Sequence, residues 1–388
     1  MVDSFHQLTG LSADEYFCSC DPVGSRLGSG GGTVWLLQQA REWLGGERSI
    51  MIHAGGRSQR LPSYAVQGKV LLPLPLGPEG RSKSLLSLQL PLYERIMQQA
   101  PESLRLMVVS GDVLILASDV LQPVPEADVV CYGLPQPDTI ASHHGVFVMD
   151  RQKPSVLLQM LQKPSLETLA SLHDDHLCLT DIGIWLFSQR ALDLLSLRAL
   201  NPQRSARLCR FAPSGQRTLN AQPSTLNYYD LYGTFGLALG THPTLVDAEL
   251  NGLSVAILPL QGGEFHHFGT SRELVSSTLA VARSMGREMN NVIVQQSEVR
   301  CPLNNANHHI WIDRSYVGER WTLTSDNIVT GVPRNDWEIH LEPGECIDVV
   351  PVGDHDYEQR RYHIDDRVDS DDLSLRANLL RIYHHCGL

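Results

Sequence analysis

A glycine-rich segment followed by basic side chains is the first candidate for chemistry in this sequence. Gly55 and Gly56 come directly after an apolar run, Arg57 and Arg60 follow them, and Lys69 lies further along the chain. Glycine lets backbone N–H groups approach an anion closely, and arginine and lysine neutralise the charge of phosphate. The pattern predicts a site for a pyrophosphate group. A tight turn with its basic side chains in solvent is the alternative.

Two aspartates are candidate metal ligands. Asp112 ends the apolar run at residues 104–110 with a Gly-Asp step, and a carboxylate at the end of a strand, facing phosphates, can hold Mg²⁺ with few other ligands. For Asp112 the alternative is a turn-forming aspartate, and for Asp230 it is the cap of the helix that follows. Lys163 is a candidate cation for substrate binding, and its alternative is a lysine in solvent before a turn proline.

A second glycine cluster lies nearer the N-terminus. Its members are Gly28, Ser29, Gly30, Gly31, Gly32 and Thr33. A helix predicted over residues 33–44 begins where the cluster ends, so its N-terminus and the backbone N–H groups before it could together bind a nucleotide phosphate. The cluster is not a P-loop, because no lysine followed by serine or threonine completes that motif. A flexible linker is the alternative.

Alternating strands and helices are expected to position these residues. Apolar runs and helical periodicity predict strands at 49–54, 104–110, 127–134 and 145–149, and helices at 33–44 and 85–99. This alternation is typical of an α/β domain with a mostly parallel sheet. In such sheets the chemistry lies at the carboxyl ends of the strands, where the loop at Gly55 and the Asp112 step both fall.

The pattern changes in the last third of the chain. Thr270 and Glu273 form a capping box at the start of a helix predicted to end near Met285. From residue 290 to residue 350, short β-rich runs alternate with polar turns, and no helical period is present. Such a region is typical of a short β-helix or a small β-sandwich.

We therefore expect the chain to divide into three parts. They are an α/β domain at residues 1–250, a β-rich domain at 251–365 that includes a bridging helix, and a tail at 366–388 with an amphipathic helix at 373–383. The length of 388 residues agrees with this division, because it exceeds what one hydrophobic core usually fills.

The composition excludes several classes of protein. The chain has 31 Lys and Arg against 43 Asp and Glu, a formal net charge of −12, so a nucleic-acid partner is not expected. No apolar run reaches the ~18 residues of a membrane-spanning helix, and the N-terminus lacks the pattern of a secretory signal. The eight cysteines are irregularly spaced, so we expect reduced thiols in a cytoplasmic protein. The sequence does not indicate the oligomeric state.

Histidines occur in four adjacent pairs, at 143–144, 266–267, 308–309 and 384–385. Neighbouring residues point to different sides of a strand or helix. No pair is therefore expected to supply two ligands to one metal ion.

The glycine-rich segment resembles a known signature. Residues 54–75, AGGRSQRLPSYAVQGKVLLPLP, resemble the motif of the sugar-1-phosphate nucleotidylyltransferases, and the Gly-Asp and Lys-Pro steps that follow occur in the same order as in that superfamily. With the cluster at 28–33 and the run FHHFGTSREL at 265–274, the sequence resembles the fucose-1-phosphate guanylyltransferase family. The similarity is greatest to the N-terminal half of its bifunctional members, which also carry a fucokinase.

The resemblance implies a fold and three catalytic residues. The fold would be a Rossmann-like nucleotidyltransferase domain with a mostly parallel sheet, followed by a parallel β-helix-like domain. Arg60 would hold the triphosphate of GTP, Lys69 would bind phosphate, and Asp112 would bind Mg²⁺.

The run at 265–274 is expected to approach the sugar phosphate. A helix that begins near Ser271 would present its N-terminus to an anion. The candidate ligands of the sugar phosphate are Lys163, His266, His267 and Arg272.

The implied reaction converts GTP and fucose-1-phosphate to GDP-fucose and pyrophosphate. The nucleophile is a phosphate oxygen that is already an anion, so positioning and charge neutralisation suffice. One alternative is the same transfer with another sugar-1-phosphate or nucleotide, and another is a module that binds a GDP-sugar without turnover. Kinase activity is not expected in this chain, which would be a one-activity version, a gene fragment or a truncated form of the bifunctional enzyme.

Overall fold

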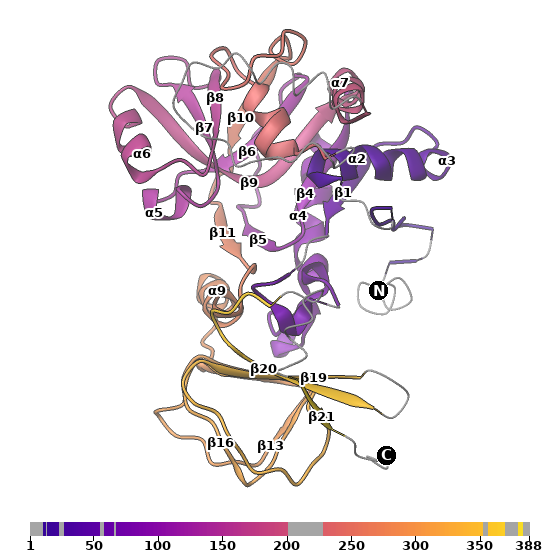
Figure 1. Cartoon of the computed structure of the whole chain (residues 1–388). Coiled ribbons are helices and arrows are strands. Elements are labelled where there is room, and N and C mark those ends of the chain that lie inside the picture. The colour runs from indigo at the N-terminus through magenta and orange to yellow at the C-terminus, as the bar shows by residue number, and fades with distance from the viewer. Residues whose placement is uncertain are drawn as a thin grey trace.

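The computed structural model describes residues 11–12, 14–22, 27–54, 58–65, 67–200, 228–351, 356–368 and 379–382. Figure 1 shows an α/β part above a β-rich part, with helix α9 (Ser271–Ser284) between them. Within the described residues, no helix is both long enough and apolar enough to cross a membrane.

The α/β part is built on a seven-stranded sheet. Its central order is β1-β4-β9-β6-β10, and β7 pairs with both β9 and β8. The strands are β1 (Ser49–His53), β4 (Leu104–Ser110), β6 (Val129–Leu134), β7 (Gly145–Asp150), β8 (Leu157–Gln162), β9 (His176–Ser188) and β10 (Val255–Pro259). The strand predicted at 104–110 is confirmed to the residue, and the other three predicted strands are confirmed with small shifts at their ends.

The sheet is mixed, so the prediction of a mostly parallel sheet is wrong. β1 pairs with β4 in parallel, and β10 with β6, but the long strand β9 runs antiparallel to β4, β6 and β7. Because β9 lies between β4 and β6, these two strands still run in the same direction. The carboxyl ends of β1, β4, β6 and β10 therefore lie at one edge of the sheet, and Asp112 follows β4 at this edge.

Strand β10 also corrects the predicted domain boundary at residue 250. Val255–Pro259 pairs with β6 inside the sheet, and β11 (Glu264–His267) pairs with β5 (Val113–Leu116), which follows Asp112. The α/β part thus extends beyond residue 250, because backbone pairing sets its limit and not the change in sequence pattern.

Helices cover both faces of the sheet. α2 (Gly28–Gln39) and α7 (Gln189–Leu200) pack on one face, and α4 (Leu85–Gln99) packs on the other. Successive residues of a strand point to opposite faces, so Val108 of β4 packs on the side of α2 and α7, whereas Val109 packs with Tyr93 of α4. The helix predicted at 85–99 is confirmed. The helix predicted at 33–44 begins earlier, at Gly28, and is divided into α2 and α3 (Arg41–Leu44).

Shorter elements complete the α/β part. They are β2 (Pro73–Leu74), β3 (Lys83–Ser84), α5 (Asp138–Ala141), α6 (Leu166–Leu172) and the short helical turns η1 (Pro62–Tyr64), η2 (Lys69–Leu71), η3 (Pro78–Gly80), η5 (Leu231–Phe235) and η6 (Gly236–Ala238). The turns η1 and η2 and the strand β2 belong to the connection from β1 to α4, which carries Arg60 and Lys69.

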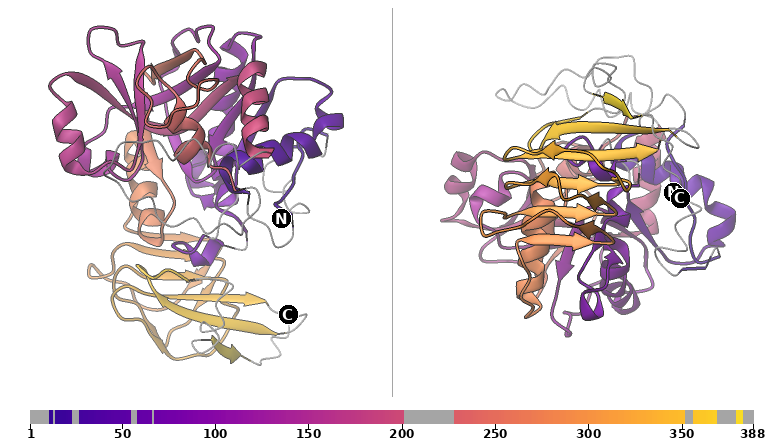
Figure 2. Two further views of the ribbon diagram at one scale, coloured as in Figure 1. Left: turned by 45° about the horizontal axis from the view of Figure 1, so that its top comes forward. Right: turned by 90° about the horizontal axis from the view of Figure 1, so that it is seen from below.

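The β-rich part stacks short strands in parallel, which confirms the predicted β-rich region at 290–350. β12 (Val292–Gln295), β14 (Ile310–Asp313), β17 (Ile328–Thr330) and β19 (Glu345–Pro351) pair in this order. Two further parallel pairs are β13 (Glu298–Val299) with β15 (Tyr316–Val317), and β16 (Trp321–Thr322) with β18 (Ile339–His340). Seen from below in Figure 2, the longest stack forms a ladder of strands.

Two antiparallel strands extend this stack. β20 (Tyr357–His363) pairs with β19, and β21 (Leu379–Ile382) pairs with β20. The helix predicted at 373–383 is therefore wrong for residues 379–382, because the edge of β20 offers backbone partners to an extended chain. The remaining residues of that predicted helix lie outside the described residues.

Candidate active site

Lys69 and Asp112 meet at the carboxyl edge of the sheet. Nζ of Lys69 lies 3.1 Å from Oδ2 of Asp112, and the two side chains are 15% and 31% exposed. Gly111, just before Asp112, donates its N–H to the carbonyl of His53 at the end of β1. A Cβ at Gly111 would lie 2.8 Å from that carbonyl oxygen, so only glycine lets the two strand ends come this close. The structure thus brings together two of the three predicted catalytic residues.

His267 is a second cationic partner of Asp112. Its Nε2 lies 3.4 Å from Oδ2 of Asp112, and its Nδ1 lies 2.9 Å from Oε2 of Glu273. Burial alone would lower the pKa of His267, but the hydrogen bonds and charges of Asp112 and Glu273 raise it to about 9. Burial would likewise raise the pKa of Asp112, but His267 and Lys69 hold it well below its usual range. A carboxylate with two cations on one oxygen therefore forms the centre of the site.

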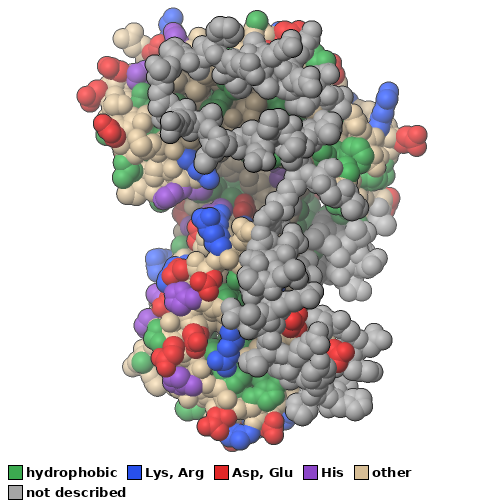
Figure 3. All heavy atoms as spheres, viewed as in Figure 1, with side chains coloured by type: hydrophobic (Ala, Val, Ile, Leu, Met, Phe, Trp, Pro, Cys, Tyr) green, Lys and Arg blue, Asp and Glu red, His purple; other side chains and the backbone are tan. Residues whose placement is uncertain are grey.

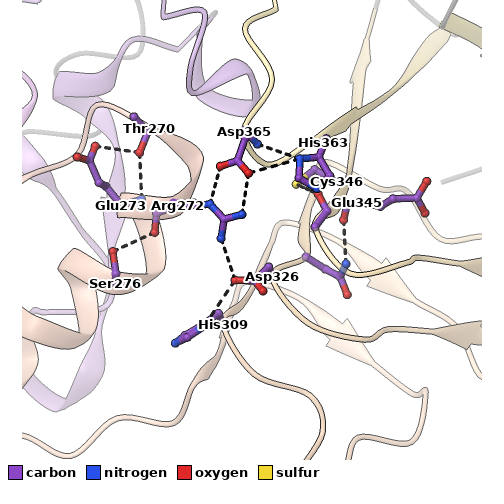
Figure 4. Close-up of polar contacts among 12 residues, drawn as sticks. Thr270, Arg272, Glu273, Ser276, His309, Asp326, Glu345, Cys346, His363 and Asp365 are labelled. Carbon is purple, nitrogen blue, oxygen red and sulfur yellow. Dashed lines mark hydrogen bonds and ion pairs between the residues drawn. The ribbon is translucent and has the colours of Figure 1, made fainter.

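The capping box of α9 fixes the position of Glu273, as predicted. The Thr270 hydroxyl accepts from the N–H of Glu273 at 3.2 Å and donates to Glu273 Oε2 at 3.0 Å (Figure 4). Glu273 Oε2 also accepts from the N–H of Gly269 at 3.1 Å. The N–H of Ser271 donates to the carbonyl of Arg60 at 2.7 Å. The start of α9 thus contacts both the predicted phosphate segment and, through His267, the carboxylate of Asp112.

His144 is a functional candidate that sequence reasoning missed. Its ring lies 5.8 Å from the ring of His267 and 5.2 Å from that of Phe265, edge to face in both cases. Burial, and then the charges of His267 and Lys163, lower the pKa of His144 to about 4. The N–H of Lys163 donates to the carbonyl of His144 at 2.9 Å. The hairpin of β7 and β8 therefore places a neutral imidazole and the predicted cation Lys163 near His267, a proximity that no local pattern could reveal.

Arg60 lies in the same connection as Lys69, and its side chain is exposed. Its backbone is held by α9, as described above. Gly55, Gly56 and Arg57, which were predicted to bind the nucleotide, lie outside the described residues.

The cluster at residues 28–33 forms the first turn of α2 and does not precede it. The N–H groups of Gly30 and Gly31 donate to the carbonyl of Tyr229 at 2.9 and 3.0 Å, and Ser29 Oγ accepts from the N–H of Leu231. A Cβ at Gly30 would lie 2.8 Å from the ring of Tyr229. These glycines therefore allow a distant segment to pack against the helix. The amides of Gly30 and Gly31 are bonded inside the protein, contrary to the predicted phosphate cradle.

Thr33, at the end of this cluster, lies beside the carboxyl end of β1. Its Oγ1 is 2.9 Å from Nε2 of His53, and burial lowers the pKa of His53 to about 4. The first turn of α2 thus borders the start of the loop at Gly55.

Asp230 acts as the cap of η5, as the alternative to a metal role predicts. Its Oδ1 accepts from the N–H of Gly233 at 2.5 Å, and its Oδ2 accepts from the Tyr228 hydroxyl at 3.3 Å. Asp230 nevertheless lies within electrostatic reach of the active edge. Burial, followed by the charges of Asp181, Asp230 and Asp112, raises the pKa of the Tyr232 hydroxyl. The charges of three carboxylates therefore act on one buried tyrosine.

Asp181 is the second residue that sequence reasoning missed. It lies in β9, is 8% exposed, and accepts from the N–H of Gly183 and from Nε1 of Trp185 at 2.8 and 3.0 Å. Burial raises its pKa to about 6. An acidic residue inside the apolar run 176–188 is the signal that could have found it.

Two predicted substrate ligands have other partners. The guanidinium of Arg272 donates to the carboxylate of Asp365 at 2.5 and 2.7 Å and lies 3.5 Å from Asp326 Oδ1 (Figure 4). His266 Nε2 lies 3.0 Å from Glu264. Arg272 therefore joins α9 to the β-rich part, and His266 points to the other side of β11 from His267, because successive residues of a strand alternate.

One group of metal-ligating side chains occurs elsewhere in the described residues. The potential ligand atoms of His308, His309 and Asp326 lie within 4.8 Å of one another. The backbone of His309 is left-handed, with φ of 53°, which explains how adjacent histidines can face one carboxylate. Arg272 contacts the same oxygen of Asp326 that His309 does, so this oxygen is already paired with a cation.

Cationic side chains gather at the sheet edge together with carboxylates. Lys69, His267 and Lys163 lie there, and the first two are paired with Asp112 and Glu273. In Figure 3, side chains of Lys, Arg and His lie along the narrow waist between the two parts of the molecule.

The chain is distantly similar to several solved structures. The mannose-1-phosphate geranyltransferase of Thermus thermophilus is 16% identical with a TM-score of 0.39, covering 82% of this chain and 96% of that chain. UDP-glucose pyrophosphorylase complexed with UDP-glucose is 11% identical with a TM-score of 0.36, covering 61% of this chain and 99% of that chain. These scores are too low to support a conclusion.

Sequence relatives give a firmer result. The chain is 47% identical over 390 residues to the L-fucokinase/L-fucose-1-P guanylyltransferase of Bacteroides fragilis, covering 94% of this chain and 39% of that protein. It is 25% identical over 305 residues to the fucose-1-phosphate guanylyltransferase of Mus musculus, covering 67% of this chain and 50% of that protein. The chain therefore spans half or less of the length of these relatives. Residues 43–360 match the model of the fucose pyrophosphorylase domain, and because this match covers most of the chain, the protein belongs to the fucose pyrophosphorylase domain family.

Proposed function

We propose that this chain forms GDP-fucose and pyrophosphate from GTP and fucose-1-phosphate. The observation that carries the proposal is the contact of Lys69 and His267 with Asp112 at the sheet edge, in a chain of the fucose pyrophosphorylase domain family. The names of the relatives, which include fucose-1-phosphate guanylyltransferase, support this choice of sugar and nucleotide.

The reaction depends on charge neutralisation and not on acid–base chemistry. An oxygen of the sugar phosphate attacks the α-phosphorus of GTP, the bond from this phosphorus to the bridging oxygen breaks, and its electron pair leaves with pyrophosphate. The attacking oxygen is already an anion, so no side chain has to remove a proton. Lys69, His267 and Lys163 would offset the charge on the phosphates, and Arg60 would hold the triphosphate.

Asp112 suits a magnesium ion. Mg²⁺ prefers carboxylate oxygens and is usually held by one or two of them together with phosphates and water. Both ion pairs of Asp112 use Oδ2, so Oδ1 is the oxygen that could bind the cation. Asp230 is the proposed second ligand, because its charge and that of Asp112 act on the same buried tyrosine, Tyr232. When bound, Mg²⁺ would neutralise phosphate oxygens.

The loop at Gly55, Gly56 and Arg57 is the proposed site for the nucleotide phosphates. It begins at the carboxyl end of β1, next to the contact between Gly111 and His53. We also propose a cytoplasmic setting, which the six free cysteines among the described residues support.

We further propose that residues 292–351 form a short parallel β-helix attached to a Rossmann-like nucleotidyltransferase domain. Parallel pairing and almost even strand spacing support the β-helix. Apolar side chains such as Ile312 and Val329 fill the interior. Backbones with positive φ recur at two sets of corresponding corners, which are Gln296, Arg314 and Gly331, and His309, Asp326 and Gly344.

A screen for pyrophosphate release tests the function. The purified chain would be incubated with Mg²⁺ and every combination of four nucleoside triphosphates and a panel of sugar-1-phosphates. The expected result is release with GTP and fucose-1-phosphate well above all other pairs. Release that is higher with another pair would reassign the substrates, and GDP-fucose binding without any release would identify a binding module.

A further inference from the structure

The connection at residues 59–77, which carries Arg60 and Lys69, has little regular structure of its own. It contains the single turns η1 and η2 and the two-residue strand β2. The backbone hydrogen bonds within the segment close only such single turns, and single turns are too short to fix the path of the whole segment. Its shape must come from the surfaces on which it packs.

One of these surfaces is the β-rich part. Apolar side chains of the connection share a buried cluster with side chains of β14, β17, β19 and β20. From the connection these are Leu61, Tyr64, Leu72, Leu74 and Leu76, and from the β-rich strands they are Trp311, Ile328, Cys346 and Tyr362. The two parts of the molecule therefore share one hydrophobic core at this point.

Donors from the C-terminal part also hold the backbone of the connection. Carbonyl groups before and after Lys69 accept hydrogen bonds from residues more than two hundred positions later. The pairs are Gln59 with the N–H of Val368 at 2.8 Å, Pro62 with Arg360 at 3.2 Å, Pro73 with Gln295 at 3.2 Å and Leu76 with Arg287 at 2.8 Å. These bonds tie the backbone of the connection to the C-terminal part on both sides of Lys69.

Tyr64 is the centre of this contact. It is fully buried, as are Trp311 and Asp313. Its hydroxyl donates to Oδ2 of Asp313 at 2.8 Å and accepts from Nε1 of Trp311 at 2.8 Å. Its backbone carbonyl accepts from the N–H of Gly68 at 2.9 Å. A short series of hydrogen bonds thus runs from strand β14 through Tyr64 to the residue next to Lys69.

We propose that the β-rich part is a working component of the active site, and that Tyr64 is the positioning residue through which it holds Lys69 opposite Asp112. The inference rests on the proposed function for the role of Lys69. It predicts that loosening the contact between Tyr64 and Asp313 moves the connection without unfolding the rest of the protein. A β-rich part that served only as a separate module would not show this coupling.

The test compares two variants of the full chain. Tyr64→Phe removes only the hydroxyl that bonds to Asp313 and Trp311. The control is Asn307→Ala, because Asn307 is also buried in the β-rich part, and its side chain bonds to Leu323, Thr324 and Asn304, none of which belongs to the connection. Both variants are expected to lose comparable stability, which urea unfolding measures.

Two readouts separate positioning from stability. Amide hydrogen exchange under native conditions is expected to be about tenfold faster at residues 68–72 in Tyr64→Phe, and unchanged there in Asn307→Ala. The kcat for pyrophosphate release is expected to fall about tenfold in Tyr64→Phe, with a smaller change in KM for GTP, whereas Asn307→Ala keeps its kcat. If Tyr64→Phe does not fold, Gln295→Met takes its place, since it removes the donor to Pro73 on the other side of Lys69.

The outcomes are distinguishable. Faster exchange at residues 68–72 together with a lower kcat supports the inference. Unchanged exchange and kcat in an active Tyr64→Phe refute the inference and leave the proposed function intact. An inactive wild type refutes both the proposed function and the role of Tyr64 in catalysis. The exchange data then decide only whether the β-rich part holds the connection in place.

Discussion

Replacement of Asp112 and replacement of Lys69 are expected to impair activity in different ways, although the two side chains contact each other. Asp112→Asn keeps the shape of the side chain but removes its charge, so both Lys69 and His267 lose an ion-pair partner. Lys69→Met removes one cation and leaves Asp112 paired with His267. The first change weakens the proposed magnesium site, whereas the second weakens the neutralisation of phosphate charge.

The geometry sets the expected magnitudes. At 3.1 Å the gross attraction between Lys69 and Asp112 is about 5 kcal/mol at an effective dielectric constant of about 20. Most of this is offset by the loss of hydration, so Lys69→Met should destabilise the fold by about 1–2 kcal/mol, and Asp112→Asn, which leaves two cations unpaired, by about 3 kcal/mol. Loss of a preorganised charge in the transition state costs about 2.7 kcal/mol or more, which corresponds to about a hundredfold in turnover. A protein with ordinary stability stays folded after such a change, so the lost turnover would not reflect unfolding.

The assay is pyrophosphate release at a series of Mg²⁺ concentrations, with stability checked by thermal unfolding. Asp112→Asn should be partly rescued at high Mg²⁺, because its defect is a weaker affinity for the ion. Lys69→Met should not be rescued. If both variants are folded and form GDP-fucose at close to the wild-type rate at low Mg²⁺, the site does not lie at this edge of the sheet.

Three further outcomes are expected. The folded-state pKa of Asp181 is about 6, above the ordinary aspartate value of 3.8, so ionisation of this residue lowers the stability of the fold as the pH rises from about 4 to 6. Asp181→Asn should therefore stabilise the fold by up to about 3 kcal/mol above pH 6 and not below pH 4. A difference in urea unfolding that does not depend on pH would contradict this. Arg272→Gln should lower the free energy of unfolding by at most about 1 kcal/mol, since the ion pair with Asp365 is half exposed. It should leave the KM for the sugar phosphate unchanged, and a large rise in that KM would identify Arg272 as a substrate ligand. Gly30→Ala should lower the free energy of unfolding by about 1–3 kcal/mol, because its Cβ would clash with Tyr229. The Cβ of Gly32→Ala would make only an ordinary contact, so this variant should be neutral or stabilising in the same unfolding measurement.

Local signals in the sequence predicted local structure well. The strand at 104–110 and the helix at 85–99 have an apolar pattern that only one kind of element can bury, and both were predicted correctly. The step from β4 to Asp112 follows from the same reasoning, because a polar residue after a buried strand must lie at the edge of a sheet. Lys69 was placed near it through the family resemblance.

Contacts between distant segments could not be predicted in this way. β9 separates β4 from β6, and its antiparallel direction depends on pairing that no local pattern encodes. The glycines at 28–31 resemble a phosphate loop in sequence, but the structure uses them to admit Tyr229, about two hundred positions away. His144 reaches His267 only because the hairpin of β7 and β8 and the strand β11 converge on one edge.

The bond between Gln59 and Val368 has a consequence for the order of folding. Contacts between the first and last thirds of the chain give the active site a high contact order, so the entropy of closing a long loop must be overcome before the site can form. During synthesis the connection at 59–77 would leave the ribosome well before residues 287–368, which hold it. Until then its apolar side chains would remain exposed to solvent. We therefore expect nascent chains shorter than about 370 residues to be inactive and to require chaperones.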